Sequence, residues 1–406
     1  MTAPPSPHAE IVVDLGAVRH NVRRLRELVS TGSTTEDAST TEDASTTEDA
    51  STTEDASTSA GPQLMVVVKA DAYGHGMVEV AEAARQAGAQ WLGVATHEEA
   101  VALREAGDTG RILCWMAGPE QDYRASVTRD VDVSAYTVDQ LQAIARAADE
   151  PARVQLKVDT GLSRGGAPRS AWEPLFEAAR EEEQRGRVRV TGVWSHFACS
   201  DEPGHPANDQ QEKAFREALD MAGAAGLRPE LRHLANSAGA LLRPSSRFDL
   251  VRLGIASYGL SPAPAEATSH DLGLRPAMTV RGRVLMVKDL SAGEGVSYGH
   301  TFVTERPTHV ALVPMGYGDG VPRQASNTAE VLVGGQRGRV LGRVCMDQLV
   351  VEAPAHVRAG DEVVLLGPGD DGEPTAQEWA EWCGTISYEI VTRMGGRQRR
   401  TWKGQE

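Results

Sequence analysis

The stretch LMVVVKADAYGHG, residues 64–76, is an apolar run that ends in one lysine and continues into a glycine-containing turn. Its centre, residues 66–68, consists of three valines, which favour a strand buried on both faces. Lys69 closes that strand, so its amine is expected at the strand end, partly removed from water. Desolvation favours the neutral amine, which is the nucleophilic form of lysine. The stretch therefore predicts a buried strand that presents a reactive lysine.

Seven further apolar segments of the same kind follow along the chain, at 91–95, 112–116, 131–135, 154–159, 190–197, 231–236 and 249–254. Helical spacing occupies most of the intervals, as at 78–88, 138–148 and 209–223. Alternating strands and helices indicate a parallel sheet, and eight such units over roughly 200 residues fit a (β/α)8 TIM-like barrel. A doubly wound open sheet is the alternative, but its usual GxGxxG turn after an early strand is absent from this sequence.

The pattern changes near residue 273. Segments such as AEVLVGGQRGRVLGRV (329–344) are short strand candidates between glycine-rich turns, and helical spacing becomes scarce. We therefore expect the barrel domain to span residues 1–272 and a mostly β C-terminal domain to span 273–406. The joint is expected in the proline- and alanine-rich stretch at 261–271.

The chain of 406 residues carries a net charge of −16, without a basic stripe of the kind that nucleic acid needs. Part of the acidity comes from the hexapeptide TTEDAS, repeated four times over residues 34–57. This polar unit has no apolar face to bury, which favours a disordered surface insertion at about 31–61 that is dispensable for chemistry. Nucleic acid is thus excluded as an expected partner.

Cysteine usage and the N-terminus favour a cytoplasmic protein. The four cysteines lie far apart and form no CxxC pair, which argues against a metal site or a disulfide framework; they are Cys114, Cys199, Cys345 and Cys383. The first ten residues lack the apolar core of a signal peptide, and no run of 18 apolar residues occurs that could span a membrane.

Polar residues end five of the eight strand candidates: Lys69, Lys157, His196, Ser237 and Arg252. Because a barrel places its active site at the C-terminal ends of its strands, these side chains are expected to converge. Loops after the last two strands often bind phosphate, and Ser237 and Gly254 suit that role. A lysine beside a phosphate site is typical of an enzyme that uses pyridoxal 5′-phosphate (PLP). Simple ion pairs remain the alternative roles for Lys157 and Arg252.

At this point a family resemblance becomes specific. Residues 66–76 resemble the lysine motif of bacterial alanine racemases, which are barrel-type (fold type III) PLP enzymes, with Asp71 in place of the usual asparagine. The likeness extends to SYEIVTRM (387–394). It implies PLP-dependent interconversion of L-alanine and D-alanine, which supplies D-alanine for peptidoglycan. It also implies a homodimer in which the barrel of one subunit and the β domain of the other share each active site.

The resemblance also assigns roles to single residues. Lys69 would hold PLP and act as one base, with Tyr298 of the partner chain as the second base on the opposite face. Arg252 would face the pyridine nitrogen and keep it unprotonated, since arginine only donates hydrogen bonds. His196 would link Tyr298 towards Arg252. The phosphate binders would be Tyr73, Ser237, Gly254, Ile255 and Tyr388.

The remaining roles concern the substrate. Arg164 and Met346 would contact the alanine carboxylate, with Asp347 in the same loop as Met346. Lys157, often carbamylated in the family, would neutralise Arg164. The entry to the site would be lined by Tyr317 and Arg323.

Three alternatives stay open at the level of sequence. A racemase of serine or of a broader range of amino acids would need only small changes in the pocket. A barrel-type PLP decarboxylase shares the architecture but carries a Cys-Asp-Gly type motif, where this chain has CMDQ at 345–348. A non-catalytic PLP-binding barrel would lack the β domain.

Overall fold

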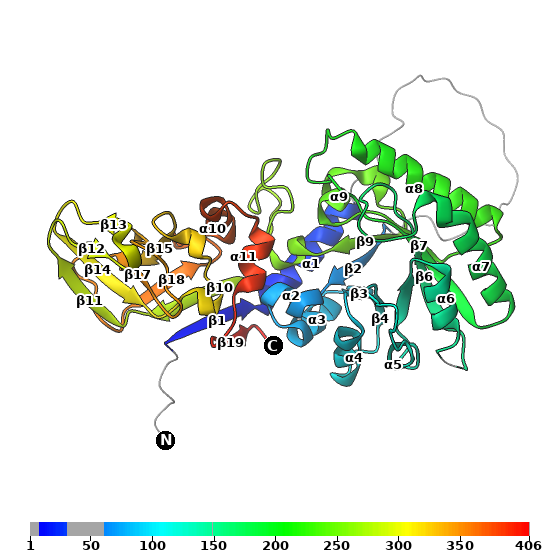
Figure 1. Ribbon diagram of the computed structural model, residues 1–406, viewed down its shortest axis with the longest axis horizontal. Helices are drawn as coiled ribbons and strands as arrows, with labels where there is room; N and C mark the ends of the chain where they lie inside the picture. The colour runs from blue at the N-terminus through cyan, green and yellow to red at the C-terminus, as the bar shows by residue number, and fades with distance from the viewer. Residues whose placement is uncertain (1–7, 31–60, 148, 406) are drawn as a thin grey trace, which may run out of the picture. The chain divides into compact units, whose positions relative to one another are not determined.

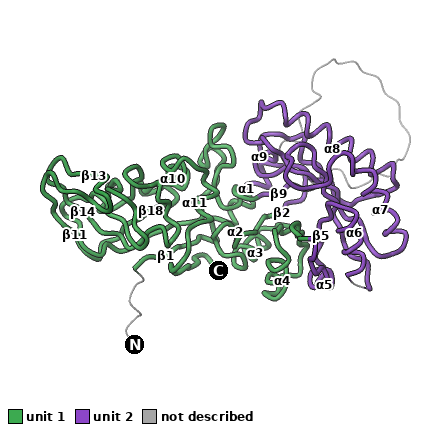
Figure 2. The backbone as a smooth tube through the Cα atoms, in the orientation of Figure 1, with its two compact units in different colours: residues 1–23, 66–118, 254–406 green, residues 24–65, 119–253 purple. Residues whose placement is uncertain are grey.

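The computed structural model describes residues 8–30, 61–147 and 149–405. The TTEDAS repeats lie outside the described residues, so the expected disordered insertion stays a prediction. The chain forms two compact units, one of residues 1–23, 66–118 and 254–406 and one of residues 24–65 and 119–253 (Figure 2). The domain boundary expected between residues 272 and 273 likewise remains a prediction.

Eight strands form one sheet in the order β8-β7-β6-β5-β4-β3-β2-β9. Strands β2, β3, β4, β6, β7 and β9 are labelled in Figure 1. The bounds of the eight strands are β2 (Gln63–Val67), β3 (Trp91–Val94), β4 (Arg111–Cys114), β5 (Asp132–Ala135), β6 (Ala152–Lys157), β7 (Val188–Trp194), β8 (Leu231–His233) and β9 (Leu250–Leu253). The two ends of this order are themselves joined, because the amide of Arg252 donates to the carbonyl of Ala235 at 3.0 Å. The predicted parallel barrel of eight strands is thereby confirmed.

The helices between these strands follow the predicted spacing. They are α3 (Met77–Gln86), α4 (His97–Glu105), α5 (Arg124–Val127), α6 (Val138–Ala145), α7 (Trp172–Gln184), α8 (Ala207–Ala224) and α9 (Ser237–Leu242). Two of them begin at a threonine that caps the helix, Thr96 before α4 and Thr137 before α6. Such a side chain accepts a hydrogen bond from an otherwise unpaired amide of the first turn, which fixes where the helix starts.

The region after the barrel is mostly β, as predicted. A six-stranded sheet has the order β16-β15-β18-β10-β1-β19, and smaller sheets have the orders β11-β14-β17 and β12-β13. The bounds are β10 (Met278–Arg283), β11 (Met286–Leu290), β12 (Gly295–Val296), β13 (Phe302–Val303), β14 (Thr308–Val313), β15 (Glu330–Val333), β16 (Gln336–Arg339), β17 (Leu349–Glu352), β18 (Glu362–Leu366) and β19 (Arg399–Lys403). Two helices also occur here, α10 (Ala376–Cys383) and α11 (Ser387–Arg393).

The first strand, β1 (Ala9–Asp14), joins this six-stranded sheet, where it runs antiparallel to β10 and parallel to β19. Its side chains alternate between buried and half-buried positions, so that Ile11 and Val13 lie in the core. Helix α1 (Leu15–Ser30) follows directly. Across the part of the chain that the structure describes, no helix combines the length and apolar character needed to cross a membrane.

Candidate functional site

Lys69 stands where the first barrel strand ends. Strand β2 stops at Val67, and Lys69 opens the short turn α2 (Lys69–Gly74). Its Nζ lies 5.9 Å from the centroid of the Trp115 ring, which gives the amine an aromatic neighbour. The strand-end position that the sequence predicted for this lysine is therefore the one it occupies.

The turn after Lys69 has an unusual backbone. Residues 70–73 all have φ of 52–53°, the left-handed region, although none of them is glycine. Each such residue costs roughly 1–2 kcal/mol relative to the right-handed conformation. Backbone strain of this kind persists only where the surroundings enforce it, and it is concentrated at functional sites.

The side chains of Glu99, Asp71 and Arg400 hold this left-handed turn. The amide of Ala70 donates to the carboxylate of Glu99 at 2.7 Å. The carboxylate of Asp71 accepts from the amide of Met77 at 2.9 Å and pairs with Arg400. These contacts fix the direction in which the chain leaves Lys69.

His75 closes the same turn. Its Nδ1 donates to the carbonyls of Ala72 and Tyr73 at 3.0 and 2.9 Å. Burial lowers the pKa of His75 to about 4, so the ring is neutral at physiological pH. His75 therefore shapes the turn through its ring nitrogen.

Tyr73 and Gly254, two of the predicted phosphate binders, approach each other closely. A Cβ on Gly254 would stand 2.6 Å from the Tyr73 hydroxyl, so that only glycine leaves room there. The rings of Tyr258 and Tyr388 lie 4.9 and 6.1 Å from that of Tyr73. Burial raises the pKa of Tyr73, which keeps its hydroxyl protonated as a hydrogen-bond donor. Ile255, the next residue after Gly254, is fully buried.

Ser237 is the first residue of α9 and is buried. The helix is capped by Asn236, whose side-chain oxygen accepts from the amide of Gly239 at 2.9 Å and from the hydroxyl of Ser200 at 2.9 Å. The first turn of α9 therefore has a fixed direction.

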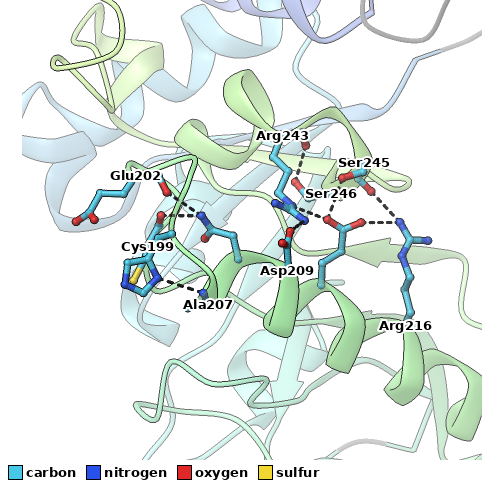
Figure 3. A network of polar contacts seen from close by, with 11 residues as sticks. Cys199, Glu202, Ala207, Asp209, Arg216, Arg243, Ser245 and Ser246 are labelled. Atoms are coloured by element: carbon cyan, nitrogen blue, oxygen red, sulfur yellow. Dashed lines mark hydrogen bonds and ion pairs between the residues drawn. The ribbon is translucent and has the colours of Figure 1, made fainter. Parts of the chain in front are cut away.

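Arg243, the residue that follows α9, belongs to a network of polar contacts with side chains of α8 (Figure 3). The carboxylate of Glu212 accepts from Arg243 at 2.6 Å, Arg216 at 2.7 Å and Ser245 at 2.9 Å. Burial opposes ionisation of Glu212, but these hydrogen bonds outweigh it and lower the pKa of the carboxyl. The helix that presents Ser237 is thus held at both of its ends.

Arg252 is buried on β9 and surrounded by acceptors. Its guanidinium donates to Nδ1 of His196 at 3.1 Å and to Nδ1 of His233 at 2.9 Å. It also donates to three backbone carbonyls, those of Ser195, His233 and Leu234. Burial lowers the pKa of Arg252 to about 9, which leaves the group cationic at neutral pH. The predicted pair of His196 and Arg252 is therefore in direct contact.

Lys157 ends β6 among aromatic rings. Its Nζ lies 4.5 Å from the centroid of Trp194 and 5.1 Å from that of Tyr136. A Cβ on Gly165 would lie 3.7 Å from the same nitrogen, which places the loop of Arg164 beside Lys157. Arg164 itself is exposed.

In the β region, neighbouring loops carry the other predicted residues. The amides of Tyr317 and Gly318 donate to the carbonyls of Cys345 and Met346 at 3.0 and 2.9 Å, which joins the expected gate to the expected carboxylate loop. The loop of Arg323 is tied to the same segment, because the hydroxyl of Ser326 accepts from the amide of Val344; Arg323 is exposed.

Tyr298 lies on a strained and exposed turn. Ser297 before it and His300 after it have φ of 61° and 44°. The hydroxyl of Ser297 donates to the carbonyl of Arg343 at 2.6 Å, so the turn is anchored to the segment that leads to Met346. The Tyr298 side chain is 72% exposed and that of Met346 54%. Tyr298 is thus an exposed phenol on an anchored turn.

Sequence reasoning missed two residues that organise these loops. Asp319 is fully buried and accepts from the amide of Gly316 at 3.1 Å and from Arg397 at 3.2 Å. Arg397 also pairs with Asp347 at 2.7 Å, so that it bridges the gate and the carboxylate loop. The signal for Asp319 was its position between glycines at 316–320, where an acid commonly caps a turn.

A barrel with a lysine at the end of its first strand, followed by a β region with an exposed tyrosine, is the architecture expected of a barrel-type PLP enzyme. Residues 50–262 match the family model "Alanine racemase, N-terminal domain" and residues 277–402 match "Alanine racemase, C-terminal domain". The alanine racemase of Salinispora tropica is 48% identical over 98% of this chain and 99% of its own length.

Solved structures agree. The alanine racemase of a D-cycloserine-producing Streptomyces lavendulae matches with a TM-score of 0.90 at 47% identity, over 99% of this chain and 98% of that chain. The alanine racemase of Bacillus anthracis with bound L-Ala-P matches with a TM-score of 0.83 at 31% identity, over 99% of this chain and 96% of that chain. This chain belongs to the alanine racemase family, whose members are PLP-dependent isomerases. It is an enzyme that interconverts L- and D-alanine, which sets the decarboxylase and the non-catalytic barrel aside.

Proposed function

We propose that this chain binds PLP and racemises alanine with Lys69 and Tyr298 as the two bases. The observation that carries the proposal is Lys69 itself, which ends a buried barrel strand and is followed by an enforced left-handed turn. Gly254 suits a phosphate site because it carries no side chain that would cover its backbone, and the Tyr73 hydroxyl, a hydrogen-bond donor, lies beside it. Lys69, Tyr73, Ser237, Gly254, Ile255 and Tyr388 would hold the cofactor.

When bound, PLP withdraws electrons from the Cα of an amino acid and so makes its α-proton acidic. Lys69 then takes or returns this proton on one face of Cα, and Tyr298 does so on the other face. Each positioned base contributes typically about 10²–10⁴ to the rate. Inversion requires both, because one base alone returns the proton to the face from which it came.

Arg252 sets the reaction type. A guanidinium donates hydrogen bonds and takes up no proton, so the pyridine nitrogen it faces would stay unprotonated. Charge built up at Cα is then delocalised less into the ring, which favours rapid return of a proton over side reactions. His196, in contact with Arg252 at 3.1 Å, would orient the phenol of Tyr298.

We further propose a homodimer in which a second copy supplies Tyr298 to each barrel. A base that works in a site closed to water is not expected to stand 72% exposed, and Met346 on the tethered neighbouring loop is exposed as well. A second subunit would cover both residues. Tyr317 and Arg323 would then line the entry to the shared site.

The substrate carboxylate would be met by Arg164 and by the backbone at Met346, with Asp347 supporting that loop. Lys157, carbamylated or not, would balance the charge of Arg164. The Bacillus anthracis relative, an alanine racemase, was solved with bound L-Ala-P, which supports alanine as the substrate of this chain. The product D-alanine would serve peptidoglycan synthesis in the cytoplasm.

The test is to follow L-alanine to D-alanine by chiral chromatography, together with the visible spectrum of the purified protein. Lys69→Ala should abolish turnover and the absorption of covalently held PLP. Tyr298→Phe should keep that absorption and lose most turnover. Lys288→Ala and Tyr123→Phe, outside the proposed site, are the matched controls. Full activity in Lys69→Ala or in Tyr298→Phe would refute the assignment of that base, and serine as a second substrate measures breadth.

A further inference from the structure

The charge of Arg252 is buried among uncharged acceptors. In the part of the chain that the structure describes, its hydrogen-bond acceptors are two imidazole nitrogens and three backbone carbonyls, with no carboxylate among them, and its Cζ lies 4.9 Å from the centroid of the Trp194 ring. Each of these acceptors therefore matters for holding the guanidinium, because an unsatisfied buried charge is costly. The imidazole of His233 is itself fully buried, so what holds His233 also holds Arg252.

The proton of His233 can be located from its partners. Arginine only donates, so Nδ1 of His233, 2.9 Å from the guanidinium, must be the acceptor. The remaining proton then lies on Nε2, which is 2.7 Å from Oε1 of Gln155 and donates to it. Burial, and next the positive charge of Arg252, hold the pKa of His233 well below its usual range, in keeping with a neutral ring.

The orientation of the Gln155 amide is fixed from its other end. Its Nε2 donates to Oδ2 of Asp132 at 3.2 Å, and an ionised carboxylate can only accept. Asp132 is fully buried, and its other oxygen, Oδ1, pairs with the guanidinium of Arg153 at 2.6 Å. The hydroxyl of Thr191 also donates to Oδ2 of Asp132, at 2.6 Å, the oxygen that accepts from Gln155.

The result is a directed chain through the barrel interior, from Asp132 on β5 and Gln155 on β6 to His233 on β8 and Arg252 on β9. If the Gln155 amide were rotated by 180°, its N–H group would face the N–H of His233 and its oxygen would face the carboxylate of Asp132. A buried polar group without a partner costs about 1–3 kcal/mol, so one orientation dominates.

We infer that Gln155 is a positioning residue of the racemase: oriented by Asp132, it fixes the proton of His233 on Nε2 and thereby keeps the guanidinium of Arg252 in place. This inference rests on the proposed role of Arg252 at the pyridine nitrogen. Gln155 touches neither substrate nor cofactor in this scheme and acts only through His233.

The first measurement is the tautomer of His233 in the full-length chain, by nitrogen NMR of protein labelled with ¹⁵N-histidine, with and without added PLP. The resonance is assigned as the one that His233→Asn removes. We expect a neutral ring protonated on Nε2. A ring protonated on Nδ1, or on both nitrogens, would overturn the inference, whether or not any Gln155 variant folds.

The second measurement compares two substitutions of Gln155. Gln155→Leu removes the acceptor and the donor together and should lower kcat about 10- to 100-fold with little change in KM, because Arg252 loses its alignment. In Gln155→Glu the new carboxyl group and the Asp132 carboxylate would hold one proton between them. A protonated carboxyl at position 155 both donates to Asp132 and accepts from His233. This variant should therefore keep kcat within about 10-fold of the wild type.

The visible absorption of bound PLP supplies a readout beyond turnover. It should shift in Gln155→Leu, because the hydrogen bond at the pyridine nitrogen changes, and should stay unchanged in the control Thr191→Val. Thr191→Val should also keep kcat within about 3-fold. If Gln155→Leu keeps the wild-type spectrum and kcat, or loses no more than Thr191→Val, the inference is wrong. Lack of alanine turnover in the wild type would refute the proposed function instead, and the NMR measurement would still decide the state of His233.

Discussion

The hydroxyl of Tyr73 fills the space that a side chain at Gly254 would need. A Cβ placed on Gly254 would lie only 2.6 Å from the hydroxyl oxygen of Tyr73. Gly254 follows the last barrel strand and Tyr73 lies in the turn after the first one, so two ends of the chain's barrel segment meet at this point. The ring of Tyr73 is held from the sides by Tyr258 and Tyr388. The phenol therefore has little freedom to retreat from a larger residue at position 254.

From this relationship we predict that Gly254→Ala weakens PLP binding. The added methyl group displaces the Tyr73 hydroxyl and blocks the approach of a phosphate to the backbone. The loss of one or two hydrogen bonds to a charged group, at about 1.5–3 kcal/mol each, corresponds to at least a 10-fold rise in the PLP dissociation constant. Titration of the PLP-free chain, followed by absorbance, measures it.

Gly107→Ala is the matched control, since a Cβ there meets nothing within 4 Å, although its φ of 97° adds backbone strain of its own. It should lower stability and leave the PLP dissociation constant unchanged. Equal PLP affinity in Gly254→Ala and the wild type would show that the space beside Gly254 is not the phosphate site.

The left-handed turn supplies a second prediction. Asp71→Ala leaves the amide of Met77 without its acceptor and Arg400 without its partner. We expect a loss of about 0.5–1.5 kcal/mol in the free energy of unfolding, measured in urea. Asp71→Asn keeps an oxygen that can accept from the amide of Met77, so its free energy of unfolding should fall by less than that of Asp71→Ala. If the alanine variant is no less stable than the asparagine variant, the carboxylate oxygen does not hold the turn.

The sequence predicted the barrel well because its signal is local. Each barrel strand is a short run of apolar residues, and Val66 to Val68 show this plainly. The place of β1 was not predictable in the same way. Its alternating pattern suits any half-buried strand, and its partners β10 and β19 lie more than 250 residues further along the chain.

Parts of the site were likewise hidden from the sequence. The left-handed turn at 70–73 contains no glycine at those four positions, so residue types gave no sign of positive φ. Gln155 and His233 look like ordinary residues of two different strands, and only the closed barrel brings them to 2.7 Å. Such pairs depend on register across the barrel, which single-strand patterns do not contain.

A third prediction concerns the loops of the β region. Asp319→Ala removes the buried carboxylate that joins the Gly316 turn to Arg397. Because Arg397 also holds Asp347, both loops should loosen, and the KM for alanine should rise about 3- to 10-fold with a smaller change in kcat. Arg397→Ala should also raise the KM for alanine. In the double variant the loss in transition-state binding should be smaller than the sum of the losses in the two single variants. Additive losses would show that the two residues act separately.

The last prediction is a pH dependence of stability at Glu212. Its pKa is lowered in the folded chain, so ionised Glu212 stabilises the fold above its ordinary pKa of about 4.3 and ceases to do so as the pH falls through the lowered value. Glu212→Gln should therefore be clearly less stable than the wild type at pH 7, and the difference should shrink below about pH 4. Urea unfolding at both pH values measures the effect. Glu217→Gln on the same helix removes an exposed pair with Arg169, worth about 0–1 kcal/mol, and serves as the control. A difference that is equal at both pH values would mean that Glu212 contributes packing rather than charge.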